Sequence, residues 1–380
     1  MKITAVETVV PDLNLSRPFV FVLVRTDEGV TGLGQTADVR TIGVLRDLAE
    51  RFLIGADPRR STLHWHEMFD WSAYHGYAGA ESRAISALDI ALWDIRGQLA
   101  GQPIGSLLGG PVREAVPIYN TCGAYAGNSD GERARRDPVG LAEELLAAGI
   151  TCMKMAPFER FIVPSRGALI TKEQLAEGVA GIEKIAAALG DRMEVMVEAH
   201  GLLSPNVAAQ VVAALDGLPV RWIEDPIAQD NTEEWVRLRE KSTVPIAGGE
   251  RLQTRHQLRR LIEHGGVDVV ISDITWCGGI TETKRVADLA ELHGVPLATH
   301  GNSGPVNLWS AAHLLTSIPN AYMAETVRVQ HDPTIGYFHK VVDGPSILTD
   351  GHLHAPTAPG LGITLRDDFP TLSSSRGATG

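Results

Sequence analysis

The chain is poor in cysteine, in aromatic residues and in long hydrophobic runs. Its 380 residues include three cysteines, and aromatic side chains make up 6% of the total. Cys122, Cys152 and Cys277 form no CxxC pair, and such an odd, sparse set argues against a disulfide framework. No apolar run approaches the roughly 18 residues that a membrane-spanning helix needs, and the first residues lack the apolar core of a signal peptide. We therefore expect a cytoplasmic protein that does not bind a membrane.

Positive charge is also scarce. Lysine and arginine number 34 against 46 aspartates and glutamates, which gives a net charge of −12. A protein that binds nucleic acid is expected to show the opposite sign and a basic patch with interleaved aromatic residues. The charge therefore excludes nucleic acid as a partner and suits a protein that gathers carboxylates around a divalent cation. The 44% of hydrophobic residues is ordinary for a globular protein.

The first 110 or so residues indicate an α+β module. Residues 3–10, 19–25 and 30–35 are β-rich runs, and the last two are separated by the turn Asp27-Glu28-Gly29. Apolar residues recur at helical spacing in 44–53 and again in 82–99. We place the boundary of this module at residue 113.

From about residue 116 the pattern changes to short β-rich runs that alternate with amphipathic helical stretches. The runs are 116–119, 151–155, 193–198, 220–224, 244–247, 267–271, 295–299 and 321–324. Eight strands in alternation with helices predict an α/β protein built on a parallel TIM-type barrel. We assign this barrel to residues 114–335, and residues 336–380 form a C-terminal segment with a strand-and-turn pattern.

Three glutamates follow consecutive strands at equal intervals. Glu198, Glu224 and Glu250 are 26 residues apart, which is about the length of one β/α unit. The C-terminal ends of barrel strands meet at one mouth, so these carboxylates should converge there. Bare carboxylates at one point repel one another, and a hard cation relieves that repulsion. All-oxygen ligation favours Mg²⁺, with Mn²⁺ possible, over zinc.

Other polar side chains end the remaining strands. His300 ends the seventh strand and Asp273 the sixth, so a carboxylate can orient the imidazole in a catalytic dyad. Lys154 ends the second strand, where it can act as a base, an acid or an electrostatic anchor for a substrate oxygen. His200 lies two residues beyond the first glutamate and serves either the chemistry or its support. Glu325 ends the eighth strand.

At this point the sequence resembles the enolase superfamily, mandelate racemase subgroup. The resemblance covers nearly the whole chain and rests on the runs 84–98, 103–104, 107–109, 222–226, 249–250 and 278–281, and on the terminal His300. It implies a modified (β/α)7β barrel beneath an α+β capping domain, to which the C-terminal tail returns. It also implies that segments near 13–19 and 53–58 are capping loops that close on the substrate.

The resemblance carries roles over to individual residues. It implies a Mg²⁺ site at Glu198, Glu224 and Glu250, a His300–Asp273 dyad, an electrophilic Glu325 near the substrate carboxylate, and a homo-oligomer. This sequence departs from the subgroup's racemases in two places. Ala156 stands where they carry the second lysine of Lys-x-Lys, and His200 is present where many members lack it. Both departures look like the subgroup's sugar-acid dehydratases.

These residues predict a Mg²⁺-dependent dehydratase acting on a small-molecule sugar acid. His300 removes the proton α to the carboxylate, His200 or Lys154 is the acid, and the enediolate loses its β-hydroxyl to give a 2-keto-3-deoxy acid. The runner-up reactions are cycloisomerisation and epimerisation or racemisation, in which Lys154 is a second base. A third reading is a non-catalytic sensor on the same fold.

A zinc hydrolase is a more distant alternative. His64-Trp65-His66 and His352-Leu353-His354 are HxH pairs, which can begin a zinc site. Neither pair follows a predicted barrel strand, so we interpret both as surface or capping residues. Candidate specificity elements are Arg17, Tyr74, His75, Tyr77, Trp276, Asn302 and the loop 158–166.

Overall fold

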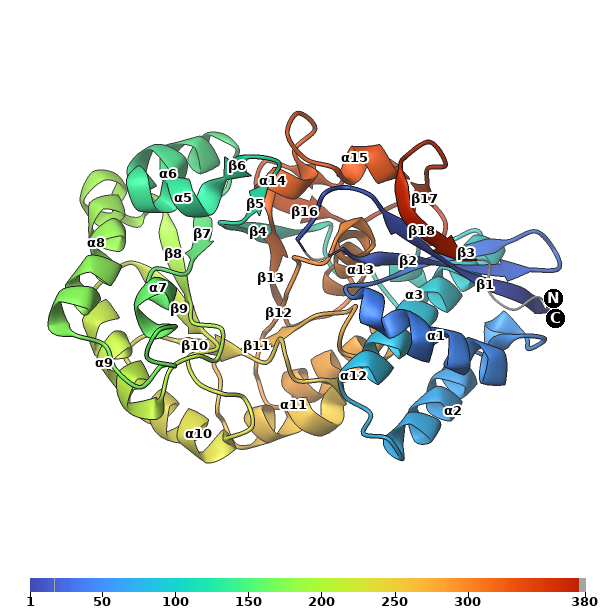
Figure 1. Cartoon of the computed structure of the whole chain (residues 1–380), viewed down its shortest axis with the longest axis horizontal. Coiled ribbons are helices and arrows are strands. Elements are labelled where there is room, and N and C mark those ends of the chain that lie inside the picture. The colour runs from blue at the N-terminus through green and yellow to red at the C-terminus, as the bar shows by residue number, and fades with distance from the viewer. Residues whose placement is uncertain (17, 376–380) are drawn as a thin grey trace.

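A computed structural model describes residues 1–16 and 18–375 of the chain. Arg17, a candidate specificity element, lies outside these residues. A barrel occupies the left and centre of Figure 1, and an antiparallel sheet with its helices lies to the right. None of the described helices is both long enough and apolar enough to cross a membrane. The three cysteines are free thiols.

The barrel contains eight parallel strands and closes on itself. The strands pair in the order β4-β7-β8-β9-β10-β11-β12-β13, and β13 pairs in turn with β4. Their bounds are β4 Ala115–Thr121, β7 Cys152–Met155, β8 Glu194–Glu198, β9 Val220–Glu224, β10 Ile246–Gly248, β11 Val269–Ser272, β12 Leu297–Thr299 and β13 Ala321–Thr326. Each overlaps a β-rich run of the sequence, so the predicted barrel is confirmed.

Seven crossovers carry helices, and the last strand is followed only by the short α14 (Arg328–His331), which matches the implied (β/α)7β pattern. The crossover helices are α5 Asp130–Arg136, α6 Pro138–Ala147, α7 Glu159–Ile162, α8 Lys172–Leu189, α9 Pro205–Leu215, α10 Thr232–Lys241, α11 Thr254–Glu263, α12 Gly279–Leu292 and α13 Pro305–Leu315. Local sequence fixes the starts of several of them. At α8, for example, Thr171 and Gln174 form a capping box.

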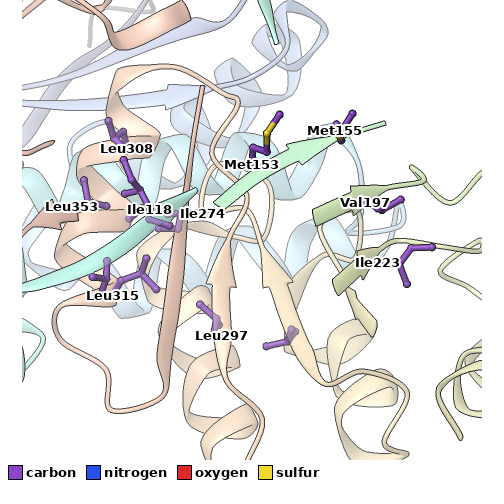
Figure 2. Close-up of a cluster of buried hydrophobic side chains, with 14 of the residues drawn as sticks. Ile118, Met153, Met155, Val197, Ile223, Ile274, Leu297, Leu308, Leu315 and Leu353 are labelled. Carbon is purple, nitrogen blue, oxygen red and sulfur yellow. The ribbon is translucent and has the colours of Figure 1, made fainter. Parts of the chain in front are cut away.

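Strand side chains alternate between two cores because successive residues of a strand point to opposite faces. One buried cluster consists only of residues from the barrel strands, among them Tyr119, Met196 and Trp222, and fills the barrel interior. The alternate residues join the layer between strands and helices. Figure 2 shows part of that layer, where Ile118 and Leu297 of the strands lie with Leu308 and Leu315 of α13.

The capping sheet has the strand order β18-β1-β2-β3. Its strands are β1 Ile3–Pro11, β2 Val20–Thr26, β3 Thr31–Thr36 and β18 Thr371–Ser375, and its helices are α1 Ile42–Leu48, α2 Ser61–Ala73 and α3 Ala80–Ala100. The helix α3 packs closely on β3, because a side chain at Gly34 would clash with the carbonyl oxygen of Ala87. The three N-terminal strands and α3 match the predicted runs, whereas α2 was not predicted.

Shorter elements complete the chain. They are 3₁₀ turns at 39–41, 58–60 and 190–192, a π-helical turn at 49–53, α4 Ile104–Leu107, β5 Ala124–Tyr125, β6 Asn128–Ser129, α15 Phe338–Val341, β14 Val342–Asp343, β15 Leu348–Thr349, β16 His352–His354 and β17 Thr364–Leu365. The C-terminal segment contacts both larger parts, since β16 pairs with β4 of the barrel and β18 with β1 of the capping sheet. The domain boundaries at 113 and 335 stay predictions.

Buried side chains join the capping part to the barrel. Asp89 of α3 accepts hydrogen bonds from the backbone N–H (2.9 Å) and hydroxyl (2.6 Å) of Thr281 on α12. Burial raises the pKa of Asp89 to about 7, although these hydrogen bonds act against the shift. Trp65 of α2 donates to the carbonyl of Gly278 (2.7 Å). The capping part is therefore fixed against the barrel by specific polar contacts.

Segment 53–58, which the resemblance implied to be a capping loop, does not lie at the barrel. Backbone hydrogen bonds join Ile3 N to Ala56 O (2.9 Å) and Gly55 N to Ile3 O (2.8 Å). The segment 53–58 therefore lies at the start of β1, whereas the barrel side of the sheet is at the other end, where Gln35 contacts Ser303 and Val306. The expectation that 53–58 closes on the substrate is wrong.

Candidate active site

The predicted site residues reach one place because strand residues alternate in direction. The interior residues Cys152, Met196, Trp222, Ile271, Ala298 and Met323 are each followed two positions later by a polar residue: Lys154, Glu198, Glu224, Asp273, His300 and Glu325. A spacing of two returns to the same strand face, so these side chains enter the barrel mouth. Glu250 is out of phase, three residues after the interior Ala247. It follows Gly249, whose φ of 122° is readily adopted only by glycine.

Glu198, Glu224 and Glu250 form a buried cluster. Each offers a carboxylate oxygen, and these three atoms lie within 4.8 Å of one another. Glu224 also accepts a hydrogen bond from Trp222 Nε1 (2.9 Å), and Glu198 accepts one from the backbone N–H of His200 (2.7 Å). An all-oxygen donor set fits a hard divalent cation. Among the described residues this is the one cluster of three or more potential metal ligands.

Lys154 supplies a positive charge at this cluster. Its Nζ lies 2.6 Å from Glu224, 3.1 Å from Glu198 and 3.1 Å from Glu325, and its side chain is 3% exposed. Burial alone would lower the pKa of Lys154, but the surrounding carboxylates outweigh it and raise that pKa well above its usual value. Lys154 is therefore held as an ammonium group by three carboxylates, which suits an electrostatic anchor better than a free base.

His300 and Asp273 form the predicted pair. His300 Nδ1 lies 2.6 Å from Asp273 Oδ2. The groups that hold this aspartate were not predicted from the sequence. Thr275 donates to Oδ1 from its backbone N–H (2.7 Å) and its hydroxyl (2.6 Å), Ser303 donates to Oδ2 (3.0 Å), and Asn307 Nδ2 lies 3.3 Å from both oxygens. The carboxylate is thus fixed from several sides, and it in turn fixes the imidazole.

His300 also faces the carboxylates of the mouth. Its Nε2 lies 3.5 Å from Glu250 and 3.9 Å from Glu325. Burial lowers the pKa of His300, but Glu250, Glu325 and Asp273 together outweigh it and raise the pKa to about 10. In this arrangement the ring is protonated at neutral pH. A role as base therefore requires a positive charge near Glu250 or Glu325 that weakens this effect.

Glu325 is held in place by two donors. The Thr121 hydroxyl donates to Oε1, and the backbone N–H of Gly301 donates to Oε2 (2.7 Å). Burial raises the pKa of Glu325, but Lys154 and His300 outweigh it and lower the pKa to about 2. Glu325 is therefore ionised here, whereas donation to a substrate carboxylate requires the protonated acid. Its implied electrophilic role stays a prediction.

His200 lies at the opposite wall from His300. The strands β8 and β12 are separated by β9, β10 and β11 on one side and by β7, β4 and β13 on the other. The His200 backbone has a φ of 50°, in the left-handed region, and its side chain is 37% exposed. Its Nδ1 lies 3.6 Å from Glu159 Oε1.

Asp225 is a further polar residue at the cluster that the sequence analysis did not single out as a site residue. It accepts a hydrogen bond from the backbone N–H of Gly249 (3.0 Å) and another from Gln229. Burial is the main reason that its pKa is raised well above the usual range, and Glu250 adds to the effect. Asp225 stands in the Glu-Asp-Pro run at the end of β9, directly after a predicted ligand, so the sequence could have indicated it. Asp225 supports the turn that carries Glu250.

The remaining candidates lie around the mouth or away from it. The Trp276 ring lies tilted by 45° against the His300 ring, with 4.7 Å between their centroids, and Gln330 donates a hydrogen bond to Asn302. Tyr74 is 89% exposed. Of the HxH pairs, His64 is buried on α2 and bonds to Asp57 O (2.8 Å), whereas His352 and His354 lie on β16, which pairs with the barrel strand β4. Neither pair belongs to a cluster of three or more potential metal ligands among the described residues.

Comparisons with known proteins agree with this architecture. Residues 4–109 match the mandelate racemase / muconate lactonizing enzyme N-terminal domain, and residues 138–369 match the enolase C-terminal domain-like family. The chain is 31% identical to a D-galactonate dehydratase of Ralstonia nicotianae, over 100% of this chain and 95% of the relative. It is 29% identical to a D-xylonate dehydratase of Haloferax volcanii, over 100% and 90%.

Solved structures extend the likeness to the fold. A crystal structure of an enolase of the mandelate racemase subgroup from Agrobacterium tumefaciens matches with a TM-score of 0.89, at 36% identity and over 100% of both chains. A member of the enolase superfamily from Salmonella Typhimurium matches with a TM-score of 0.90, at 27% identity, over 98% of this chain and 99% of that one.

Proposed function

The chain belongs to the mandelate racemase / muconate lactonizing enzyme family of the enolase superfamily, and from this membership we propose that it dehydrates an acid sugar. One observation carries the proposal. A buried cluster of three glutamates follows β8, β9 and β10, with His200 after β8 and His300 across the mouth after β12. That arrangement offers a base and an acid on either side of one bound molecule. The D-galactonate and D-xylonate dehydratases among its relatives suggest an aldonate as the substrate.

Glu198, Glu224 and Glu250 would hold a divalent cation, Mg²⁺ or Mn²⁺. Such an ion supplies positive charge where the substrate carboxylate becomes more negative, which is worth several kcal/mol. The residues of the chain support its binding, because the cluster is buried and consists of oxygen donors only. Lys154 lies against two of these glutamates and Glu325, so it would neutralise the excess negative charge and meet a substrate oxygen.

His300 would remove the proton from the carbon next to the carboxylate. Asp273 accepts from Nδ1, which leaves Nε2 as the atom that takes the proton. The base must start neutral, and positive charge bound beside Glu250 would lower the raised pKa of His300 toward that state. A positioned base of this kind contributes roughly 10²–10⁴-fold to the rate.

The hydroxyl on the next carbon would then leave toward His200. The C2–H bond breaks and its electron pair moves into the carboxylate, which gives an enediolate. That pair then returns to form the C2–C3 double bond as the C3–O bond breaks and His200 gives the oxygen a proton. Water leaves, and the enol gains a proton at C3 as its C2 hydroxyl loses one, which gives a 2-keto-3-deoxy acid. Because His300 and His200 lie on opposite walls, we propose that proton and hydroxyl leave from opposite faces. Lys154 is engaged with three carboxylates, which favours His200 as the acid.

The test is a screen of acid sugars with Mg²⁺, beginning with D-galactonate and D-xylonate, in which 2-keto acids are detected and the product is identified by NMR. We expect loss of one water per turnover. Products of unchanged mass would instead show a cycloisomerase or an epimerase. Metal-dependent stabilisation without turnover across the whole screen would contradict an enzymatic role and favour a sensor.

A further inference from the structure

A carboxylate faces each of the two histidines of the mouth. On β12, His300 has Asp273 at 2.6 Å from its Nδ1. At the opposite wall, His200 has Glu159 Oε1 at 3.6 Å from its own Nδ1. Among the described residues Glu159 makes no hydrogen bond or ion pair to any other side chain. Glu159 lies in the loop 158–166, a candidate specificity element, and no role of its own was predicted for it.

The backbone at His200 turns its ring toward this carboxylate. His200 adopts the left-handed conformation (φ 50°), which L-residues rarely adopt without support. The support comes from Glu198, which accepts the His200 N–H (2.7 Å), and from Gly201 N, which donates to Asp225 O (2.6 Å). The Nδ1 atom is buried and has no hydrogen-bond partner among the described residues. A buried ring nitrogen of this kind calls for a partner, and Glu159 is the nearby carboxylate.

Glu159 is itself held by the docking of its loop onto the loop of His200. Phe158, at the start of α7, packs against α8 so closely that a side chain at Gly178 would clash with its ring. At the far end of the loop, Ser204 N donates to Gly167 O (3.0 Å), and the backbone of Gly167 touches that of Leu202. These contacts fix the position of α7 relative to His200, although the Glu159 side chain is 43% exposed.

We propose that Glu159 is a positioning residue that holds Nδ1–H of His200, so that Nε2 carries the proton given to the leaving hydroxyl. This inference rests on the proposed dehydration. The 3.6 Å separation exceeds hydrogen-bond range, and bonds of this kind commonly shorten when substrate is bound. With Nδ1–H bound to Glu159, His200 passes from imidazolium to the neutral Nδ1–H tautomer as it releases the Nε2 proton. Glu159 then does for the acid what Asp273 does for the base.

The experiment compares E159Q with the wild type and with E177Q. Glu177 pairs with Arg160 of the same loop and is exposed, so E177Q is a matched control for charge and location. Each protein is incubated in deuterated water with Mg²⁺ and an acid sugar that the wild type dehydrates. NMR gives both the dehydration rate and the incorporation of deuterium at C2 of the remaining substrate. We expect E159Q to dehydrate roughly 10–100-fold more slowly, and its ratio of C2 exchange to dehydration to rise at least about tenfold, because C2 proton removal by His300 is untouched.

A double variant separates positioning from a general structural effect. If Glu159 acts through His200, H200N and H200N/E159Q should have the same residual dehydration rate within about twofold. The inference would be overturned if E159Q had the wild-type ratio of C2 exchange to dehydration. It would also be overturned if E159Q slowed dehydration as much in the H200N background as it does in the wild type. If the wild type dehydrates no acid sugar, the proposed function fails and this inference fails with it. If the wild type dehydrates the acid sugar and E159Q dehydrates it equally fast, the inference about Glu159 is overturned and the proposed function stands.

Discussion

At the scale of single residues, the proposed base His300 can be replaced without changing the proposed metal ligands. Its Nε2 faces the mouth, and its Nδ1 is committed to Asp273. H300N keeps a polar side chain but has no base, so we expect the exchange of the C2 proton of a bound aldonate to fall by at least roughly 10²-fold. Mg²⁺ affinity measured by calorimetry should stay close to that of the wild type, because the three glutamates are unchanged.

His293 offers a control for that substitution, since it is exposed at the end of α12. H293N should exchange the C2 proton at the wild-type rate. Normal exchange in H300N would remove His300 from the role of base, whatever the product of the reaction.

His313 makes a prediction about acid stability. It is buried, with Nδ1 accepting from Gly105 N (3.1 Å) and Nε2 donating to Leu361 O (3.1 Å). Burial lowers its pKa to about 4, whereas the unfolded chain has the usual value of 6.5. The neutral ring therefore contributes stability that is complete above pH 6.5 and is lost as the pH falls toward 4. A shift of this size corresponds to at most roughly 3 kcal/mol in the free energy of unfolding.

The difference between wild type and H313N isolates this contribution. Buried Asp89 and Asp94 have pKa values raised by burial to about 7 and about 6, so their contributions grow as the pH falls. They are common to both proteins and cancel in the comparison. Between pH 7.5 and 4, the free energy of unfolding measured with denaturant should fall less steeply in H313N than in the wild type. An equal fall in the two proteins would contradict the role of His313.

The sequence located the site residues that end strands and missed those that depend on loop paths. Glu198, Glu224 and His300 could be found because parallel strand ends meet at one mouth and alternate residues share a face. Thr275 lies two residues after Asp273 and donates to its carboxylate. An aspartate followed two residues later by a threonine is a local turn pattern, so this contact could have been predicted from the sequence. Glu159 lies in a loop whose course no periodicity determines, so only the structure brings it to His200.

At the scale of elements, the packing of α3 on β3 is the tightest contact of the capping part. Gly34 has no room for a side chain, because a Cβ atom would overlap the carbonyl oxygen of Ala87 in α3. We expect G34A to lower the free energy of unfolding by roughly 1–3 kcal/mol, or more if the helix cannot shift. Thermal or denaturant unfolding measures this.

The control for that substitution is G43A. Gly43 lies in α1 and has open space where a Cβ would be built. Alanine is the better helix former by up to about 1 kcal/mol, so G43A should be neutral or stabilising. Equal destabilisation by both substitutions would contradict the close helix–sheet contact.

Elements with a clear period were predicted, and those held by tertiary contacts were not. All eight barrel strands and α3 follow from alternation and helical spacing. The helix α2 has polar residues spread along it, and its buried Trp65 is fixed by the Gly278 carbonyl of the barrel. The position of segment 53–58 was predicted wrongly because the family resemblance does not give the loop lengths of this chain. In the structure this segment forms backbone hydrogen bonds with Ile3.

At the scale of the whole molecule, the account predicts that metal binding stabilises the fold. The proposed ligands come from three consecutive barrel strands, and the unfolded chain does not bring them together. An ion that binds only the folded state at 100 times its dissociation constant adds about 2.7 kcal/mol. The melting temperature of the wild type should be higher with Mg²⁺ than with a chelator. In E224Q most of this difference should be lost.

The central claim is that the three glutamates hold one hard dication, and anomalous diffraction from a crystal soaked in Mn²⁺ tests it most directly. The account predicts one strong peak within bonding distance of a carboxylate oxygen of each of Glu198, Glu224 and Glu250. A map without a peak there at saturating Mn²⁺ would contradict it.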